Sequence, residues 1–209
     1  MNSATEEQST VFLVDDDDSV RVSLSRALKK RGFQVSTFPS AESFLESYDP
    51  RQPGCLVLDY GMPGLNGLEL QQHLVRERIS IPIIFISGHG GIPESVQAMK
   101  AGAVDFLEKP FRQHLLVECI ESSFRKDLEN RKYRESTRSA RERYGQLTAR
   151  EKEVAQFIIA NPSHTSSKEI GRELDISPRT VDHHRARILE KMGIGSVAEL
   201  IDLSASLTD

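Results

Sequence analysis

Two patterns of hydrophobic and polar positions alternate along the first part of the chain. Short apolar runs, most of which end on a polar residue, are separated by stretches in which apolar residues recur every three or four positions. The short runs predict buried strands, and the longer stretches predict amphipathic helices. Strands are expected at five places: 11–14, 33–37, 55–58, 83–86 and 103–107. Strands that alternate with helices in this way predict an α/β domain with a doubly wound, five-stranded parallel sheet.

Polar residues stand where the predicted strands end. The carboxyl ends of parallel strands form one edge of a sheet, so polar side chains at those ends meet there. The residues expected at this edge are Asp15, Asp16, Asp59, Ser87 and Lys109. Three carboxylates around one point make a hard-oxygen site suited to Mg²⁺. A lone aspartate at a strand end is more often a helix cap, so it is the other four residues that favour a chemical role for Asp59.

Asp59 is predicted to be a nucleophile that accepts a phosphoryl group and forms an acyl phosphate. Lys109 would offer a positive charge to one phosphoryl oxygen, and the Ser87 hydroxyl would donate a hydrogen bond to another. A new group with a charge of about −1.5 to −2 would draw both side chains inward. Phe106, three residues before Lys109, could then swing into the space that Ser87 vacates.

Beyond residue 145 the apolar spacing is helical throughout. Thr148 and Glu151 have the spacing of a capping box, a short helix covers 168–174, and Ser177 followed by Pro178 opens another helix. Two helices joined by a short turn, the second rich in Arg and His, indicate a helix-turn-helix. The net charge of −4 does not by itself indicate nucleic acid, so a protein-docking bundle stays open as the alternative.

A charged connector separates the two regions. Residues 128–143 carry six basic and three acidic residues, with neither proline nor glycine. This composition predicts a helix that extends out of the first domain. The helix could pair with a second chain as a coiled coil, or it could be a solvated spacer. Its weak apolar periodicity favours the spacer.

Four motifs of the first region carry a resemblance, and they are Val14-Asp15-Asp16, Leu58-Asp59-Tyr60-Gly61-Met62-Pro63, Ile86-Ser87-Gly88 and Glu108-Lys109-Pro110. Over about residues 9–125 the chain resembles the receiver domain of two-component response regulators. The resemblance implies that Asp59 is the phosphoacceptor. It also implies that Asp16, Asp59 and the backbone carbonyl of Gly61 bind the metal, with help from Asp15.

The same resemblance assigns Ser87 and Phe106 as a switch pair and implies a cis bond before Pro110. Phe106 stands where the family frequently has tyrosine, so a hydroxyl is missing from the pair.

The second region carries its own set of motifs, which are Leu147-Thr148-x-Arg150-Glu151-x-Glu153-Val154, then Lys168-Glu169-Ile170, then Ile176 to Ile188. Over about residues 145–203 these resemble the LuxR-type DNA-binding domain of the NarL/FixJ response regulators.

This second resemblance implies a scaffold helix at 168–175 and a recognition helix at 179–192. By the resemblance and the local basic face, the DNA-contacting residues are Arg179, Thr180, Asp182, His183, Arg185, Ala186, Arg187 and Lys191. Among them Asp182, His183 and Ala186 are expected to face bases. The turn at 161–167 is longer than the family's usual spacing, and a contact with the DNA backbone, a contact with the receiver or no contact all stay open.

The predicted domains are a flexible N-terminus (1–8), a receiver domain (9–125), a helical linker (126–144) and a LuxR-type helix-turn-helix domain (145–205). The predicted function is that of a two-component transcriptional regulator. A sensor histidine kinase is expected to phosphorylate Asp59, and the protein is expected to bind promoter DNA as a homodimer. RNA polymerase is a further candidate partner. A phosphatase is the enzymatic alternative, but Gly61 stands where a second acid would be needed.

Bulk properties agree with a regulator of this kind. Hydrophobic residues make up 38% of the chain, without a long uncharged apolar stretch, so no membrane segment is expected. The N-terminus lacks the pattern of a signal peptide. Two cysteines, Cys55 and Cys119, lie in apolar contexts as expected of reduced thiols. These features predict a cytoplasmic protein.

Overall fold

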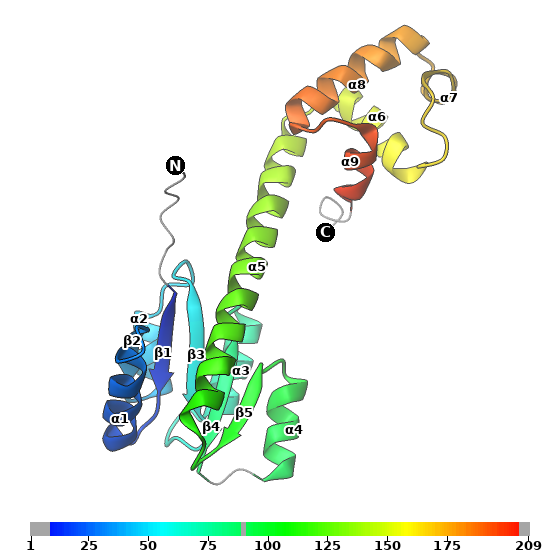
Figure 1. The fold of residues 1–209 in the computed structure, drawn as a ribbon. Coiled ribbons are helices and arrows are strands. Elements are labelled where there is room, and N and C mark those ends of the chain that lie inside the picture. Colours follow the sequence, from blue (N-terminus) through cyan, green and yellow to red (C-terminus); the bar gives the residue numbers. More distant parts are fainter. Residues whose placement is uncertain (1–8, 89–90, 205–209) are drawn as a thin grey trace. The chain divides into compact units, whose positions relative to one another are not determined.

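The computed structural model describes residues 9–88 and 91–204, and the predicted N-terminal segment 1–8 lies outside this part of the chain (Figure 1). The chain divides into two compact units, residues 1–130 and 131–209. The border between the units falls inside the predicted linker.

The first unit is built around five parallel strands. In chain order these are β1 (Thr10–Val14), β2 (Gln34–Phe38), β3 (Gly54–Asp59), β4 (Ile83–Ser87) and β5 (Asp105–Glu108). They lie in the order β2-β1-β3-β4-β5, and every neighbouring pair is parallel. The predicted fold class is therefore confirmed.

Helices cover both faces of this sheet (Figure 1). They are α1 (Asp18–Lys29), α2 (Ala41–Ser47), α3 (Gly67–Arg76), α4 (Ile92–Lys100) and α5 (Gln113–Gly145). Successive strand residues point to opposite faces. Val11 and Leu13 of β1 therefore pack with α1 and α5, whereas Phe12 and Val14 pack with α2, α3 and α4.

Local hydrogen bonds explain where the helices begin. Asp17 caps α1 by accepting from the backbone N–H groups of Ser19 and Val20, and Ser40 and Asn66 cap α2 and α3 through capping boxes. Each cap satisfies a backbone donor that has no partner inside its helix.

One strand prediction is wrong by two residues. The fifth strand begins at Asp105 instead of 103, because the backbone N–H of Ala103 still donates to Ala98 at the end of α4. The second strand is displaced by one residue, to Gln34–Phe38. Neither shift changes which residues stand at the carboxyl edge of the sheet.

The helix α5 runs without a break from Gln113 to Gly145, across the border between the units. Leu116, Ile120, Ser123 and Asp127 are 0–1% exposed at helical spacing, so this face packs on the sheet. Leu128 is already 52% exposed. The predicted domain borders themselves stay a prediction.

In its described residues, the second unit contains the distal part of α5 and four shorter helices. These are α6 (Ala149–Ala160), α7 (Ser167–Glu173), α8 (Pro178–Met192) and α9 (Val197–Asp202). Their core contains Val154, Ile158, Ile170, Val181 and Ile188, each at most 1% exposed. No helix in the described part of the chain combines the length and apolar character that a bilayer crossing requires.

Candidate phosphorylation site and nucleic-acid interface

Three polar residues from distant parts of the chain meet at the carboxyl edge of the sheet. Asp15 follows β1, Asp59 ends the neighbouring strand β3, and Lys109 follows β5. Lys109 Nζ lies 2.7 Å from Asp15 Oδ2 and 2.7 Å from Asp59 Oδ1. Asp15 and Asp59 are only 1% and 6% exposed. The expectation that these three residues converge is confirmed.

Backbone groups satisfy the two remaining carboxylate oxygens. The N–H of Gly61 donates to Asp59 Oδ2 at 2.8 Å, and the N–H of Asp17 donates to Asp15 Oδ1 at 2.9 Å. Each buried oxygen therefore has a donor, which is what burial of a charged carboxylate requires.

Burial and hydrogen bonding have opposite effects on the pKa values of Asp15 and Lys109. Burial raises the pKa of the Asp15 carboxyl, although hydrogen bonds from Lys109 and from the Asp17 N–H oppose that rise. For Lys109, burial acts to lower the pKa, but hydrogen bonds to Asp15 and Asp59 outweigh it and the pKa is raised. Lys109 is therefore a cation that compensates the negative charge of two buried acids.

A glycine allows α3 to begin directly against the Asp59 strand. A Cβ on Gly67 would lie 2.4 Å from the carbonyl oxygen of Asp59 and 3.1 Å from Cα of Tyr60. A side chain at this position would displace the backbone that carries Asp59. Sequence reasoning attached no role to Gly67.

Asp16 does not join the other two acids, because its side chain is exposed while Asp15 points inward. Consecutive residues of an extended chain point to opposite sides. Among the residues with described positions, no group of three His, Cys, Asp or Glu side chains is gathered. The paired oxygens of Asp15 and Asp59 nevertheless have the chemistry that a hard divalent cation prefers, and a cationic group already stands between them.

The predicted switch residues lie beside this site. Ser87 is 2% exposed at the end of β4, and its carbonyl accepts from the N–H of Lys109 at 2.7 Å. Phe106 is half-buried, and its ring centroid lies 6.2 Å from that of Phe85 and 6.0 Å from that of Tyr60. Sequence reasoning missed Tyr60, which directly follows Asp59 and packs against the predicted switch residue.

The peptide bond between Lys109 and Pro110 is cis, as the resemblance implied.

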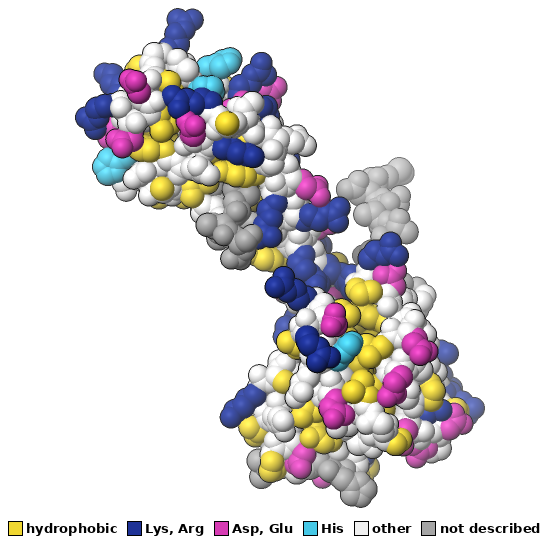
Figure 2. Space-filling view, turned by 180° about the vertical axis from the view of Figure 1, so that it is seen from behind, with side chains coloured by type: hydrophobic (Ala, Val, Ile, Leu, Met, Phe, Trp, Pro, Cys, Tyr) yellow, Lys and Arg dark blue, Asp and Glu magenta, His cyan; other side chains and the backbone are white. Residues whose placement is uncertain are grey.

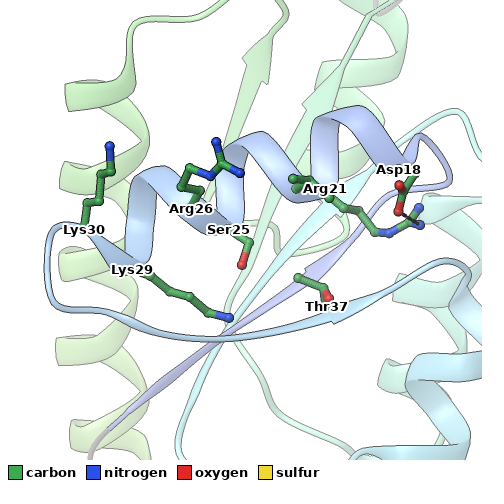
Figure 3. A pocket seen from close by; sticks show the side chains of 8 residues that line it. Asp18, Arg21, Ser25, Arg26, Lys29, Lys30 and Thr37 are labelled. Carbon is green, nitrogen blue, oxygen red and sulfur yellow. Dashed lines mark hydrogen bonds and ion pairs between the residues drawn. The ribbon is translucent and has the colours of Figure 1, made fainter.

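Arg21 of α1 contacts the backbone next to the site. It donates to the carbonyl of Asp15 at 2.6 Å and pairs with Asp18 at 2.8 Å. Arg21 also lines an open pocket of about 550 Å³ beside α1, together with Arg26, Lys29 and Lys30 among others (Figure 3). This pocket is a basic surface that is chemically distinct from the acidic site.

In the second unit, a glycine and an arginine shape the turn between α7 and α8. A Cβ on Gly171 would lie 2.6 Å from the carbonyl oxygen of Ile176, so only glycine allows this close approach. Arg150 of α6 donates to the carbonyl of Leu174 at 2.7 Å. Ser177 then caps α8, with Pro178 at its first position as predicted.

The predicted DNA-contacting residues of α8 differ in exposure. Those that are exposed are Arg179, Asp182, His183, Ala186 and Arg187, whereas Thr180, Arg185 and Lys191 are half-buried. Figure 2 shows Lys, Arg and His side chains on the surface of the second unit, interspersed with acidic ones. Basic side chains are therefore exposed on α8, next to acidic ones, although the chain as a whole is acidic.

Lys191 has a buried partner within its own unit. Its Nζ lies 2.6 Å from Oε2 of Glu151, whose side chain is 6% exposed. The hydrogen bond from Lys191 lowers the pKa of Glu151 to about 2. The same Glu151 oxygen accepts from the N–H of Thr148 at 2.8 Å, which completes the predicted capping box. Lys191 thus joins α8 to α6, a contact between residues 40 positions apart that sequence spacing did not reveal.

Arg185 and Asp182 also have partners within the chain. Arg185 Nη1 donates to the carbonyl of Thr165 at 3.1 Å and to Ser167 Oγ at 3.3 Å, and Ser167 Oγ donates to Asp182 Oδ1. Arg187 instead forms an exposed ion pair with Glu190 one turn away.

Comparison with protein families identifies both units. Residues 11–121 match the response regulator receiver domain, and residues 145–204 match the bacterial regulatory proteins of the luxR family. The transcriptional regulatory protein FixJ of Bradyrhizobium diazoefficiens is 40% identical over 194 residues, which are 93% of each chain. The response regulator protein TodT of Pseudomonas putida is 38% identical over 201 residues, which are 96% of this chain and 87% of that protein.

Solved structures agree with these matches. The response regulator StyR is similar over 95% of this chain and 98% of its own, with a TM-score of 0.81 and 44% identity. Full-length FixJ from B. japonicum is similar over 96% and 97%, with a TM-score of 0.57 and 38% identity. The chain therefore belongs to the transcriptional response regulators that join a receiver domain to a LuxR-type DNA-binding domain.

Proposed function

We propose that Asp59 accepts a phosphoryl group from a cognate sensor histidine kinase, and that this modification controls promoter binding by α8. One observation carries the proposal. A buried carboxylate at the end of β3 is paired at 2.7 Å with the Lys109 ammonium, in the same chain as a helix-turn-helix. An acid held in this way is positioned for attack on phosphorus.

The transfer itself is a displacement at phosphorus. An oxygen of Asp59 forms a bond to phosphorus while the bond from phosphorus to the kinase's histidine nitrogen breaks, and the electron pair stays on that nitrogen. Asp59 loses its carboxylate charge, so Lys109 can turn from the carboxylate to a phosphoryl oxygen. The Ser87 hydroxyl donates to another phosphoryl oxygen, and Phe106 moves toward the space left by Ser87.

A Mg²⁺ ion would be held by Asp16, Asp59 and the carbonyl of Gly61, with Asp15 assisting, and the exposed Asp16 side chain would have to turn toward Asp59 to take part. When bound, it supplies positive charge between Asp59 and the incoming phosphoryl group. The hard oxygens of Asp15 and Asp59, which lie on either side of one cationic group, support this assignment.

On the DNA side, we propose that the residues of α8 that reach the promoter are Arg179, Thr180, His183, Ala186 and Arg187. The protein binds as a homodimer, since two half-sites supply the affinity that one small domain lacks. We also propose that the promoter-bound protein contacts RNA polymerase and that it acts in the cytoplasm.

Acetyl phosphate with Mg²⁺ tests the proposal without a kinase. Mass spectrometry of the intact protein is expected to show one added phosphoryl group on the parent chain and none on Asp59→Asn. Asp49→Asn, which changes an exposed acid paired with Arg51, is the matched control and should be modified like the parent. Modification that survives Asp59→Asn would refute the assignment, and sustained release of phosphate would favour an enzyme instead.

A further inference from the structure

The long turn at 161–167 is attached to the recognition helix through the Ser167 hydroxyl and the Thr165 carbonyl. Ser167, the first residue of α7, donates its hydroxyl hydrogen to Asp182 Oδ1. The Ser167 hydroxyl oxygen in turn accepts from Arg185 Nη1 at 3.3 Å. A hydroxyl has one hydrogen to donate and lone pairs to accept with, so Ser167 can serve both residues at once.

Arg185 extends this attachment into the turn. Its Nη1 also donates to the carbonyl of Thr165 at 3.1 Å. That carbonyl precedes Ser166, which caps α7 through a capping box with Glu169. The guanidinium group therefore supports the last residues of the long turn at the point where the scaffold helix begins.

Helical spacing places the two α8 partners together. Asp182 and Arg185 are three residues apart, so they lie on one face of the helix. This face is turned toward the start of α7, as their shared bond to Ser167 requires. Asp182 and Arg185 carry opposite formal charges on this face, so together they add no net charge to it.

We propose that Ser167, Asp182 and Arg185 are positioning residues, which fix the angle between α7 and α8 and hold the long turn. Asp182 does not read a base, and Arg185 does not hold a phosphate. The turn at 161–167 together with these three side chains, here called the brace, stabilises the position of the recognition helix within the DNA-binding unit. This inference rests on the proposed role of α8 in reading DNA.

Hydrogen exchange on the full-length protein tests the brace without DNA. Loss of bonds to two charged partners should raise amide exchange in peptides covering 161–167 by roughly fivefold to tenfold in Ser167→Ala. Ser167→Thr keeps the hydroxyl and should restore slow exchange, while Ser163→Ala, an exposed serine of the same turn, should resemble the parent. Circular dichroism verifies that each variant is folded. Parent-like exchange in Ser167→Ala would overturn the proposal.

A double-mutant cycle on DNA separates positioning from base reading. The probe is a duplex that the phosphorylated parent selects from a randomised library. Ser167→Ala and Asp182→Ala should each weaken binding about tenfold, the double variant should be no weaker than either, and no single base preference should relax. Additive losses, or relaxed preference at one base pair in Asp182→Ala alone, would show that Asp182 reads DNA. If the parent selects no duplex, the proposed DNA function fails, and the exchange experiment still decides the brace.

Discussion

The two units arrange their polar residues in opposite ways. In the receiver unit, Asp15 and Asp59 are buried, and each of their four oxygens has a donor. On α8 the polar residues are exposed or half-buried, and Arg185 and Lys191 turn to partners on other elements. In a parallel sheet, the strand order determines which residues lie next to each other at the carboxyl edge. A helix face has no such order, because neighbouring helices decide whether an arginine meets DNA or its own chain.

The strongest test of the first arrangement is removal of its cation. Lys109→Met leaves two buried acids without their shared partner and removes a donor from the developing phosphoryl charge. The rate of modification by acetyl phosphate should fall roughly a hundredfold, as it does when a positioned donor is lost. Lys100→Met, at an exposed lysine of α4, is the control. An unchanged rate in Lys109→Met would mean that the ammonium only balances charge.

A smaller effect is expected where the backbone itself positions the site. Gly67→Ala places a Cβ 2.4 Å from the Asp59 carbonyl oxygen and 3.0 Å from the Phe85 ring. Overpacking against backbone should lower the free energy of unfolding by about 2–3 kcal/mol. Gly145→Ala is the matched control, because a Cβ there meets nothing within 4 Å. Denaturant titration measures both, and equal stability of the two variants would contradict the close approach.

These cases indicate what the sequence can predict. The convergence of Asp15, Asp59 and Lys109 follows from strand order alone, since parallel strands deliver their ends to one edge. The exposure of Asp16 agrees with the alternation of side chains along an extended chain, which the expectation of three converging acids did not take into account. The Glu151–Lys191 pair joins residues from two helices whose packing angle no periodicity specifies. Sequence motifs therefore located both functional regions but could not assign every side chain a partner.

The Glu151–Lys191 pair is the corresponding test of the second unit. Lys191→Met leaves Glu151 buried without its cation and should cost about 1–2 kcal/mol of unfolding free energy, since Lys191 is 31% exposed and solvent weakens the pair. Arg187→Met breaks an exposed pair and should cost less than about 0.5 kcal/mol. Equal losses would mean that Lys191 contributes little to packing.

The same pair predicts a pH dependence. The pKa of Glu151 is lowered from 4.5 to about 2 by the hydrogen bond from Lys191. A carboxyl with a lowered pKa in the folded state stabilises the protein above its ordinary pKa, and this contribution is lost as the pH falls through the folded value. The stability difference between parent and Lys191→Met should therefore be full above pH 4.5 and shrink toward pH 2. A constant difference across that range, measured by denaturant titration, would exclude Glu151 as the partner.

The smallest expected effect concerns Tyr60, which lies in the Asp59 motif but was given no role by the sequence analysis. Its ring packs edge-on against Phe85 at 5.9 Å and Phe106 at 6.0 Å, and such ring pairs contribute about 0.5–1.5 kcal/mol. Tyr60→Leu should lower unfolding free energy by that amount, whereas Tyr133→Leu, at a ring that is 63% exposed, should leave it unchanged. Because Tyr60 also limits where Phe106 can move, Tyr60→Leu should alter the nuclear magnetic resonance signals of the Phe106 ring before phosphorylation. Unchanged ring signals would mean that Phe106 is held by Phe85 alone, and that the residue after Asp59 has no part in the switch.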